Sequence, residues 1–141
     1  MPKKSLYSIV FAAISAQPVV AYEISGVAIE SREYVVLVQD IAKCKALFEA
    51  SLKYRAYELQ FEVDEEKFSD EKLQDDKRLV SSAEERMLEV EKRLPLKHRK
   101  YLEKKRERSY LEGSVNGELL STSTIARHMR DCMDKAELVL K

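Results

Sequence analysis

Apolar residues recur at helical spacing in the first long segment of the chain. Steps of three or four residues separate Leu37, Ile41, Cys44, Phe48, Leu52, Ala56, Leu59 and Val63. Such steps line one face of an α-helix. The pattern predicts a helix from Glu33 to Asp64, about 48 Å long at 1.5 Å per residue, with Cys44 on its buried face. The preceding residues 22–31 mix a glycine with β-branched residues, and we expect an extended or irregular lead-in there.

A second apolar seam follows with a seven-residue repeat. Ser69 is the expected N-cap of this helix, because it precedes two acids that favour a first helical turn. The heptad positions are occupied by Leu73, Val80, Ala83, Met87, Val90 and Leu94. A repeat this short is typical of the interior seam of a bundle, so we expect this helix to pack antiparallel to the first. Pro95 interrupts it.

The last third of the chain predicts two further helices. Residues 96–111 form a sparsely apolar helical stretch, and the glycine-rich segment Gly113–Gly117 predicts a loop after it. Ser121 or Ser123 can then cap a final helix. Its apolar face consists of Ile125, Met129, Cys132, Ala136 and Val139.

The N-terminus has the layout of a secretory signal peptide. Lys3 and Lys4 precede sixteen uncharged residues, and small side chains near Ala21 suit cleavage after that residue. We therefore expect residues 1–21 to be a cleaved signal peptide and residues 22–141 to be a single helical domain. The alternative is an N-terminal segment that packs into the core. A permanent membrane anchor is not favoured, because a span needs about 20 apolar residues and this stretch contains Gln17 and Pro18.

Composition and cysteine usage define the fold class. Of 141 residues only three are glycine and three proline, which is typical of helices. Cys44 and Cys132 both lie in the expected mature chain and each occupies the apolar face of its helix. An even pair of cysteines in an exported chain predicts a disulfide; two buried thiols in a cytosolic protein are the alternative. The sequence thus predicts an all-α fold: a small antiparallel bundle of three to four helices, with one disulfide joining the first and last.

Residues suited to catalysis or metal binding are few. His98 and His128 are the two histidines, and only His128 has candidate co-ligands at helical spacing, in Asp131 and Cys132. A structural zinc site needs four ligands, and the remaining sequence offers no second pair. We expect both histidines to be solvated. The sequence also lacks a phosphate-binding glycine loop and a nucleophile elbow, so we predict a protein that is not an enzyme and uses no cofactor or metal.

Charge is segregated along the chain although the formal net charge is zero. Residues 58–76 carry a balance of −7, and residues 92–108 a balance of +7. The two segments can pair with each other, recognise partners of opposite charge, or be solvated helix faces. Two tyrosines among basic residues of the first helix add a face of the kind enriched at protein interfaces. The candidate protein-binding residues are Tyr54, Tyr57, Arg99, Lys100, Lys104, Lys105, Arg106 and Arg108.

These features favour an exported, periplasmic or extracellular protein that binds another protein, as an inhibitor of a toxin or hydrolase does. In layout the chain resembles the small all-helical, disulfide-bearing periplasmic immunity proteins that neutralise cell-wall-degrading effectors. The leader, a mature length near 120 residues, the helices and the cysteine pair carry this resemblance, which assigns no site residue. One alternative is an oligomeric coiled-coil chaperone or assembly factor in the periplasm. The other is a cytosolic RNA-binding protein that uses residues 92–108; an exported protein would not bind nucleic acid.

Overall fold

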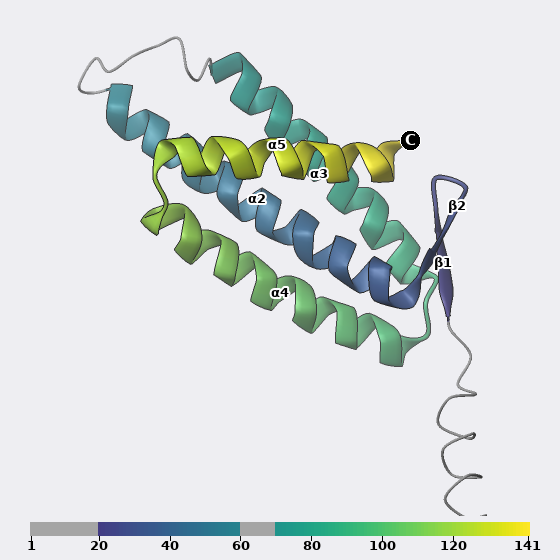
Figure 1. Ribbon diagram of the computed structural model, residues 1–141. Coiled ribbons are helices and arrows are strands. Elements are labelled where there is room, and N and C mark those ends of the chain that lie inside the picture. The colour runs from purple at the N-terminus through teal and green to yellow at the C-terminus, as the bar shows by residue number, and fades with distance from the viewer. Residues whose placement is uncertain (1–19, 60–69) are drawn as a thin grey trace, which may run out of the picture.

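A computed structural model of the chain describes residues 20–59 and 70–141. Four helices pack together in it: α2 (Ser31–Leu59), α3 (Asp70–Lys92), α4 (Leu96–Leu119) and α5 (Thr122–Leu140). About 85% of the described residues are helical. Figure 1 shows α2 at the centre, with the other three helices around it. The predicted all-α bundle is confirmed.

A β-hairpin precedes the bundle, where the sequence predicted an irregular lead-in. Strands β1 (Ala21–Ile24) and β2 (Val27–Glu30) pair antiparallel, with Tyr22 opposite Ile29. Ser25 and Gly26, the two residues between the strands, have φ angles of 51° and 78°, which is typical of a type I′ turn. Alternation accounts for the strands, since Tyr22 and Ile24 face the core while their neighbours are exposed.

The expected signal peptide lies almost wholly outside the described residues. Residues 1–19 are not described, and Ala21, after which cleavage was predicted, is the first residue of β1. A cut there would remove Val20, which lines the cleft described below, and the outermost pair of the hairpin, Ala21 with Glu30. None of the described helices has an apolar stretch long enough to cross a membrane.

The helix directions follow from contacts between distant residues. Arg55 at the end of α2 pairs with Asp70 at the start of α3, whereas Tyr34 near the start of α2 bonds to Met87. The helices α2 and α3 are therefore antiparallel, as predicted. The α5 helix is also antiparallel to α2, and α4 runs parallel to it (Figure 1).

A disulfide joins the first and last helices of the bundle, as predicted. The Sγ atoms of Cys44 on α2 and Cys132 on α5 are 2.09 Å apart. Both residues are buried, in a core to which every predicted apolar residue of the last helix also contributes. The predicted seam of α3 is buried as well at Leu73, Val80, Ala83 and Met87.

The first helix begins earlier than predicted, and its buried face is shorter; its predicted end at Asp64 lies outside the described residues. It begins at Ser31, two residues before the predicted start, and is described as far as Leu59. Ala56 is exposed, so the buried face ends before it. The side chain of Leu59, together with Val63 and the predicted cap Ser69, lies outside the described residues.

The glycine-rich segment is helical, which corrects the predicted loop. Helix α4 continues through Gly113 and Gly117 to Leu119, and both glycines are buried. A Cβ atom at position 113 would lie only 2.8 Å from the carbonyl oxygen of Lys43 on α2. Gly117 faces Ala50 in the same way. The backbones of α4 and α2 approach closely at both positions, and only glycine, which has no side chain, fits there without displacing a neighbour.

Candidate functional site

The sequence-predicted basic residues divide into three environments on α4. Lys100, Lys104 and Arg108 are exposed. Arg106 turns inward, where its Nη1 donates a hydrogen bond of 2.6 Å to Oε2 of the buried Glu91. Lys105 is half-buried, with its Nζ 5.5 Å from the centroid of the Tyr101 ring.

Arg99 is the sixth predicted basic residue and is half-buried. Its Nε atom is buried and has no hydrogen-bond partner among the described residues. Arg99 and Arg106 therefore contribute to packing between helices, and the solvent-facing charge comes from the other positions.

The outward cations form one line along α4. Lys97, Lys100, Lys104 and Arg108 are spaced by three or four residues, which places them on one face of the helix. This face is opposite to Gly113 and Gly117, which pack against α2, since helical positions repeat every 3.6 residues. We call these four residues the basic stripe. None of them forms an ion pair among the described residues.

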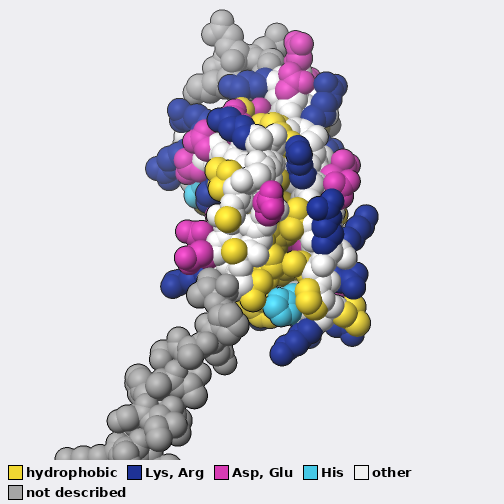
Figure 2. All heavy atoms as spheres, turned by 90° about the vertical axis from the view of Figure 1, so that its right-hand side faces the viewer, with side chains coloured by type: hydrophobic (Ala, Val, Ile, Leu, Met, Phe, Trp, Pro, Cys, Tyr) yellow, Lys and Arg dark blue, Asp and Glu magenta, His cyan; other side chains and the backbone are white. Residues whose placement is uncertain are grey.

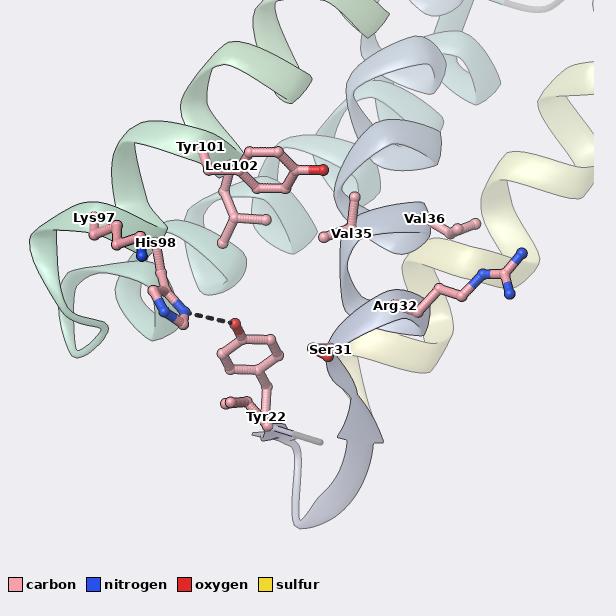
Figure 3. Close-up of a pocket in the computed structure, with 10 residues that line it drawn as sticks. Tyr22, Ser31, Arg32, Val35, Val36, Lys97, His98, Tyr101 and Leu102 are labelled. Atoms are coloured by element: carbon pink, nitrogen blue, oxygen red, sulfur yellow. Dashed lines mark hydrogen bonds between the residues drawn. The ribbon is translucent and has the colours of Figure 1, made fainter. Parts of the chain in front are cut away.

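An apolar cleft lies where β1 and the first turns of α2 and α4 meet. Its volume is about 540 Å³. Val20, Tyr22, Val35, Val36, Tyr101 and Leu102 form its apolar walls. Ser31, Arg32, Lys97 and His98 supply its polar groups. We call this feature the anchor cleft. Figure 3 shows Arg32 and Val36 on the α2 side and Lys97 and His98 on the α4 side.

One wall of the cleft is held by a tyrosine pair and a histidine. The Tyr22 hydroxyl and Nδ1 of His98 share a hydrogen bond of 3.3 Å (Figure 3). The Tyr22 ring also packs against the Tyr34 ring, with centroids 4.4 Å apart. Burial raises the pKa of the Tyr22 phenol, so this group is a neutral hydroxyl at pH 7. His98 is thus half-buried and bonded, which corrects the expectation that both histidines are solvated; His128 is exposed.

The cleft and the basic stripe form one surface. Lys97 belongs to both, and Tyr101 stands between the cleft and Lys104 along the helix. Among the described residues, two exposed cations, Arg32 and Lys97, and no acidic residue line the cleft. Figure 2 shows hydrophobic side chains gathered down the middle of this end of the molecule, with charged side chains on both sides of them.

The two predicted tyrosines lie away from this surface. Tyr54 and Tyr57 are 41% and 61% exposed near the end of α2. Because Gly117 of α4 lies against Ala50 of α2, the level of Tyr54 is about 20 Å beyond Arg108 along the helix axes. The structure therefore does not join these tyrosines and the basic residues into one site.

The sequence did not predict the anchor cleft. Its residues come from a strand and two helices whose meeting depends on the tertiary fold. The signal that could have found it is Tyr101, an aromatic residue in a strongly basic helix, together with the alternation around Tyr22. Within residues 20–59 and 70–141, His, Cys, Asp and Glu side chains form no group of three or more that could hold a metal ion.

Comparisons with known proteins add no assignment to this geometry. No protein-family model matches the chain, and neither a curated protein nor a solved structure matches it.

Proposed function

We propose that this chain is an exported, non-enzymatic helical bundle that binds another protein. The observation that carries the proposal is the continuous surface formed by the anchor cleft and the basic stripe. A central apolar pocket beside a charged border is a common arrangement at protein interfaces. The basic stripe favours an acidic partner, because opposite charges speed encounter and select the partner.

The disulfide supports the cellular part of this proposal. Disulfides persist in oxidising compartments and are rare in the cytosol, and the Cys44–Cys132 bond lies inside the bundle. A rigid, cross-linked binder suits the inhibitor or immunity role predicted from the layout of the sequence. The coiled-coil chaperone has less support, since α3 uses its heptad residues inside this bundle.

Intact-mass measurement tests export. The full reading frame is expressed in a Gram-negative host, and the product is weighed before and after reduction and alkylation. We expect the mass of residues 22–141, with two thiols that appear only after reduction. A product that retains Pro2 and has two free thiols would reject export and favour the RNA-binding alternative, whose binding should weaken steeply with salt.

Charge reversal tests protein binding through the basic stripe. Lys104→Glu with Arg108→Glu is compared with Arg127→Glu with Arg130→Glu, a pair of exposed cations on α5 that undergoes the same change in charge. We expect the wild type and the α5 variant to retain the same periplasmic partner, and the α4 variant to lose it. Equal retention by both variants would place binding elsewhere, and absence of any partner of the wild type would reject the proposal.

A further inference from the structure

We infer that the anchor cleft receives one bulky apolar side chain of an extended acidic segment of the partner, whose carboxylates then lie along the basic stripe. This inference rests on the proposed function and specifies its partner by chemistry. It assigns the two parts of the surface different tasks. The cleft supplies apolar burial, and the stripe supplies charge and direction.

The walls of the cleft favour an apolar anchor. Leu102 and Tyr22 are 1% and 7% exposed and form a closed floor, while Val36 and Tyr101 at the margins are 48% and 53% exposed. These marginal side chains would lose contact with water if an aromatic side chain entered between them. The volume of about 540 Å³ lies within the usual range of ligand sites, roughly 300–1,000 Å³.

The cleft is held in shape without a partner. Tyr22 is fixed by the hydrogen bond to His98 on one side and by the ring of Tyr34 on the other. Tyr34 itself is fully buried, and its hydroxyl donates a hydrogen bond to the Met87 carbonyl on α3. A preformed pocket loses little conformational entropy when it is filled.

The charges around the cleft favour an anionic partner. Arg32 and Lys97 line the cleft, are exposed, and form no ion pair among the described residues. No carboxylate of residues 20–59 or 70–141 lines the cleft to balance them. An uncharged apolar segment would bring its chain close to these cations without compensating their charge, whereas an acidic segment pairs with them.

The spacing of the stripe matches a polypeptide. Lys104 and Arg108 lie about 4.5 Å and 10.5 Å beyond Tyr101 along α4, at 1.5 Å per residue. An extended peptide advances about 3.3 Å per residue. Carboxylates two to four residues from the anchoring side chain therefore reach both cations. A small amphiphile with one carboxylate would engage the cleft and leave these two cations unused.

Four fluorescent peptides test the inference. The first carries tryptophan with glutamate at the second, third and fourth positions after it. The other three replace the tryptophan by alanine, the glutamates by glutamine, or both. Affinity for the purified protein, in the form that its intact mass defines, is measured by fluorescence anisotropy. We expect the tryptophan–glutamate peptide to bind at least tenfold more tightly than either singly changed peptide.

Paired variants locate the anchor. Val36→Ala with Tyr101→Ala removes the cleft margins, and Val115→Ala with Leu119→Ala removes two exposed apolar side chains from the other half of α4. We expect the first variant to bind the tryptophan and alanine peptides with equal affinity. The second variant should still bind the tryptophan peptide more tightly. Thermal unfolding of both variants shows whether the fold is retained, since all four side chains are surface-exposed.

The outcomes separate the inference from the proposed function. Equal affinity of the tryptophan and alanine peptides would show that the cleft does not receive an apolar side chain. The same conclusion would follow if the cleft variant still bound the tryptophan peptide more tightly than the alanine peptide. Either result would leave binding of an acidic partner in place. Equal affinity of the glutamate and glutamine peptides would overturn the acidic character of the segment. Failure of all four peptides to bind would overturn the inference, while retention of a periplasmic partner by the wild type would still support the proposed function. Displacement of the peptides by an equal concentration of single-stranded RNA would count against both.

Discussion

At Gly113, the closest approach of α2 and α4 depends on a missing methyl group. We predict that Gly113→Ala destabilises the protein, even though alanine is about 1 kcal/mol better than glycine in a helix interior. The added Cβ would meet the Lys43 carbonyl oxygen and the Ala46 side chain, 2.8 Å and 2.9 Å away. Overpacking of this kind costs about 1–3 kcal/mol, and urea unfolding measures the difference.

A matched control is Asn116→Ala on the same helix. Asn116 is exposed, so its replacement by a better helix former should leave the free energy of unfolding unchanged or raise it slightly. If Gly113→Ala behaves like Asn116→Ala, the helices separate easily and the close contact contributes no stability.

Glu91 gives the bundle a pH dependence. Burial raises the pKa of this carboxyl, and its hydrogen bond with Arg106 only partly opposes the shift. Between the ordinary glutamate pKa and the raised value, the folded state therefore binds more protons than the unfolded state. Stability contributed by protonated Glu91 is complete at acidic pH and declines as pH rises through this interval.

The test compares the wild type with Glu91→Gln in urea titrations from acidic to neutral pH. We predict that the free energy of unfolding of the wild type, relative to the variant, decreases as pH rises through that interval. A relative stability that stays constant, or that increases with pH, would contradict a raised pKa of Glu91.

The two glycines also show what residue-level reasoning misses. Two glycines four positions apart, with Ser114 and Asn116 between them, are typical of a turn, and the sequence alone predicted a loop. Their real role depends on Lys43 and Ala50, nearly 70 positions earlier in the chain. The close packing of α4 against α2 outweighs the local preference of glycine for a turn, so the helix continues through both positions.

At the scale of elements, the disulfide joins two antiparallel helices that are far apart in sequence. Cys44 and Cys132 are separated by 88 positions. We predict that Cys44→Ala with Cys132→Ala lowers the free energy of unfolding by about 4 to 5 kcal/mol at most, which is the chain-entropy value for a loop of this length. Urea unfolding in the absence of reductant measures the loss.

Reductant supplies the control for this double variant. Reduction should lower the stability of the wild type to near that of the variant and leave the variant unaffected. A variant as stable as the oxidised wild type would mean that the helices α2 and α5 hold together through packing alone.

Helix α5 could be predicted because its apolar residues recur regularly at steps of three and four residues. All five residues of its predicted apolar face are buried, and a three-four repeat at this length has no competing interpretation. The hairpin was not predicted, since each strand has only four residues and a helix follows at once. Its alternation and the Ser25–Gly26 turn were visible in the sequence, but such short strands become stable only when Tyr22 and Ile24 pack on the bundle.

At the scale of the molecule, the described acids of the acidic segment and the first residue of the basic segment lie at opposite ends of α3. The described acids of residues 58–76 are Asp70, Glu71, Asp75 and Asp76, at the start of this helix. The basic segment begins with Lys92 at its end, about 33 Å from Asp70 at 1.5 Å per residue, and continues into α4, which runs antiparallel to α3. Pairing between the two segments across a helical hairpin, one of the sequence hypotheses, does not occur among these residues.

The basic stripe, which forms no ion pair among the described residues, predicts steered association with an acidic partner. The association rate constant of the tryptophan–glutamate peptide should fall steeply as salt is added, while its dissociation rate constant changes little. Stopped-flow fluorescence at several salt concentrations measures both. Lys104→Glu with Arg108→Glu should flatten the salt dependence; a wild-type association rate that does not respond to salt would contradict the role of the basic stripe.

The Cys44–Cys132 bond also determines what a broken backbone would do to this protein. Together with the chain between these cysteines it closes a covalent ring that contains all of α3 and α4, and therefore the whole basic stripe. A protease that cuts one peptide bond within the ring leaves a single covalent molecule. Its two pieces separate only after reduction, so the surface that carries the proposed function can outlast a first proteolytic cut.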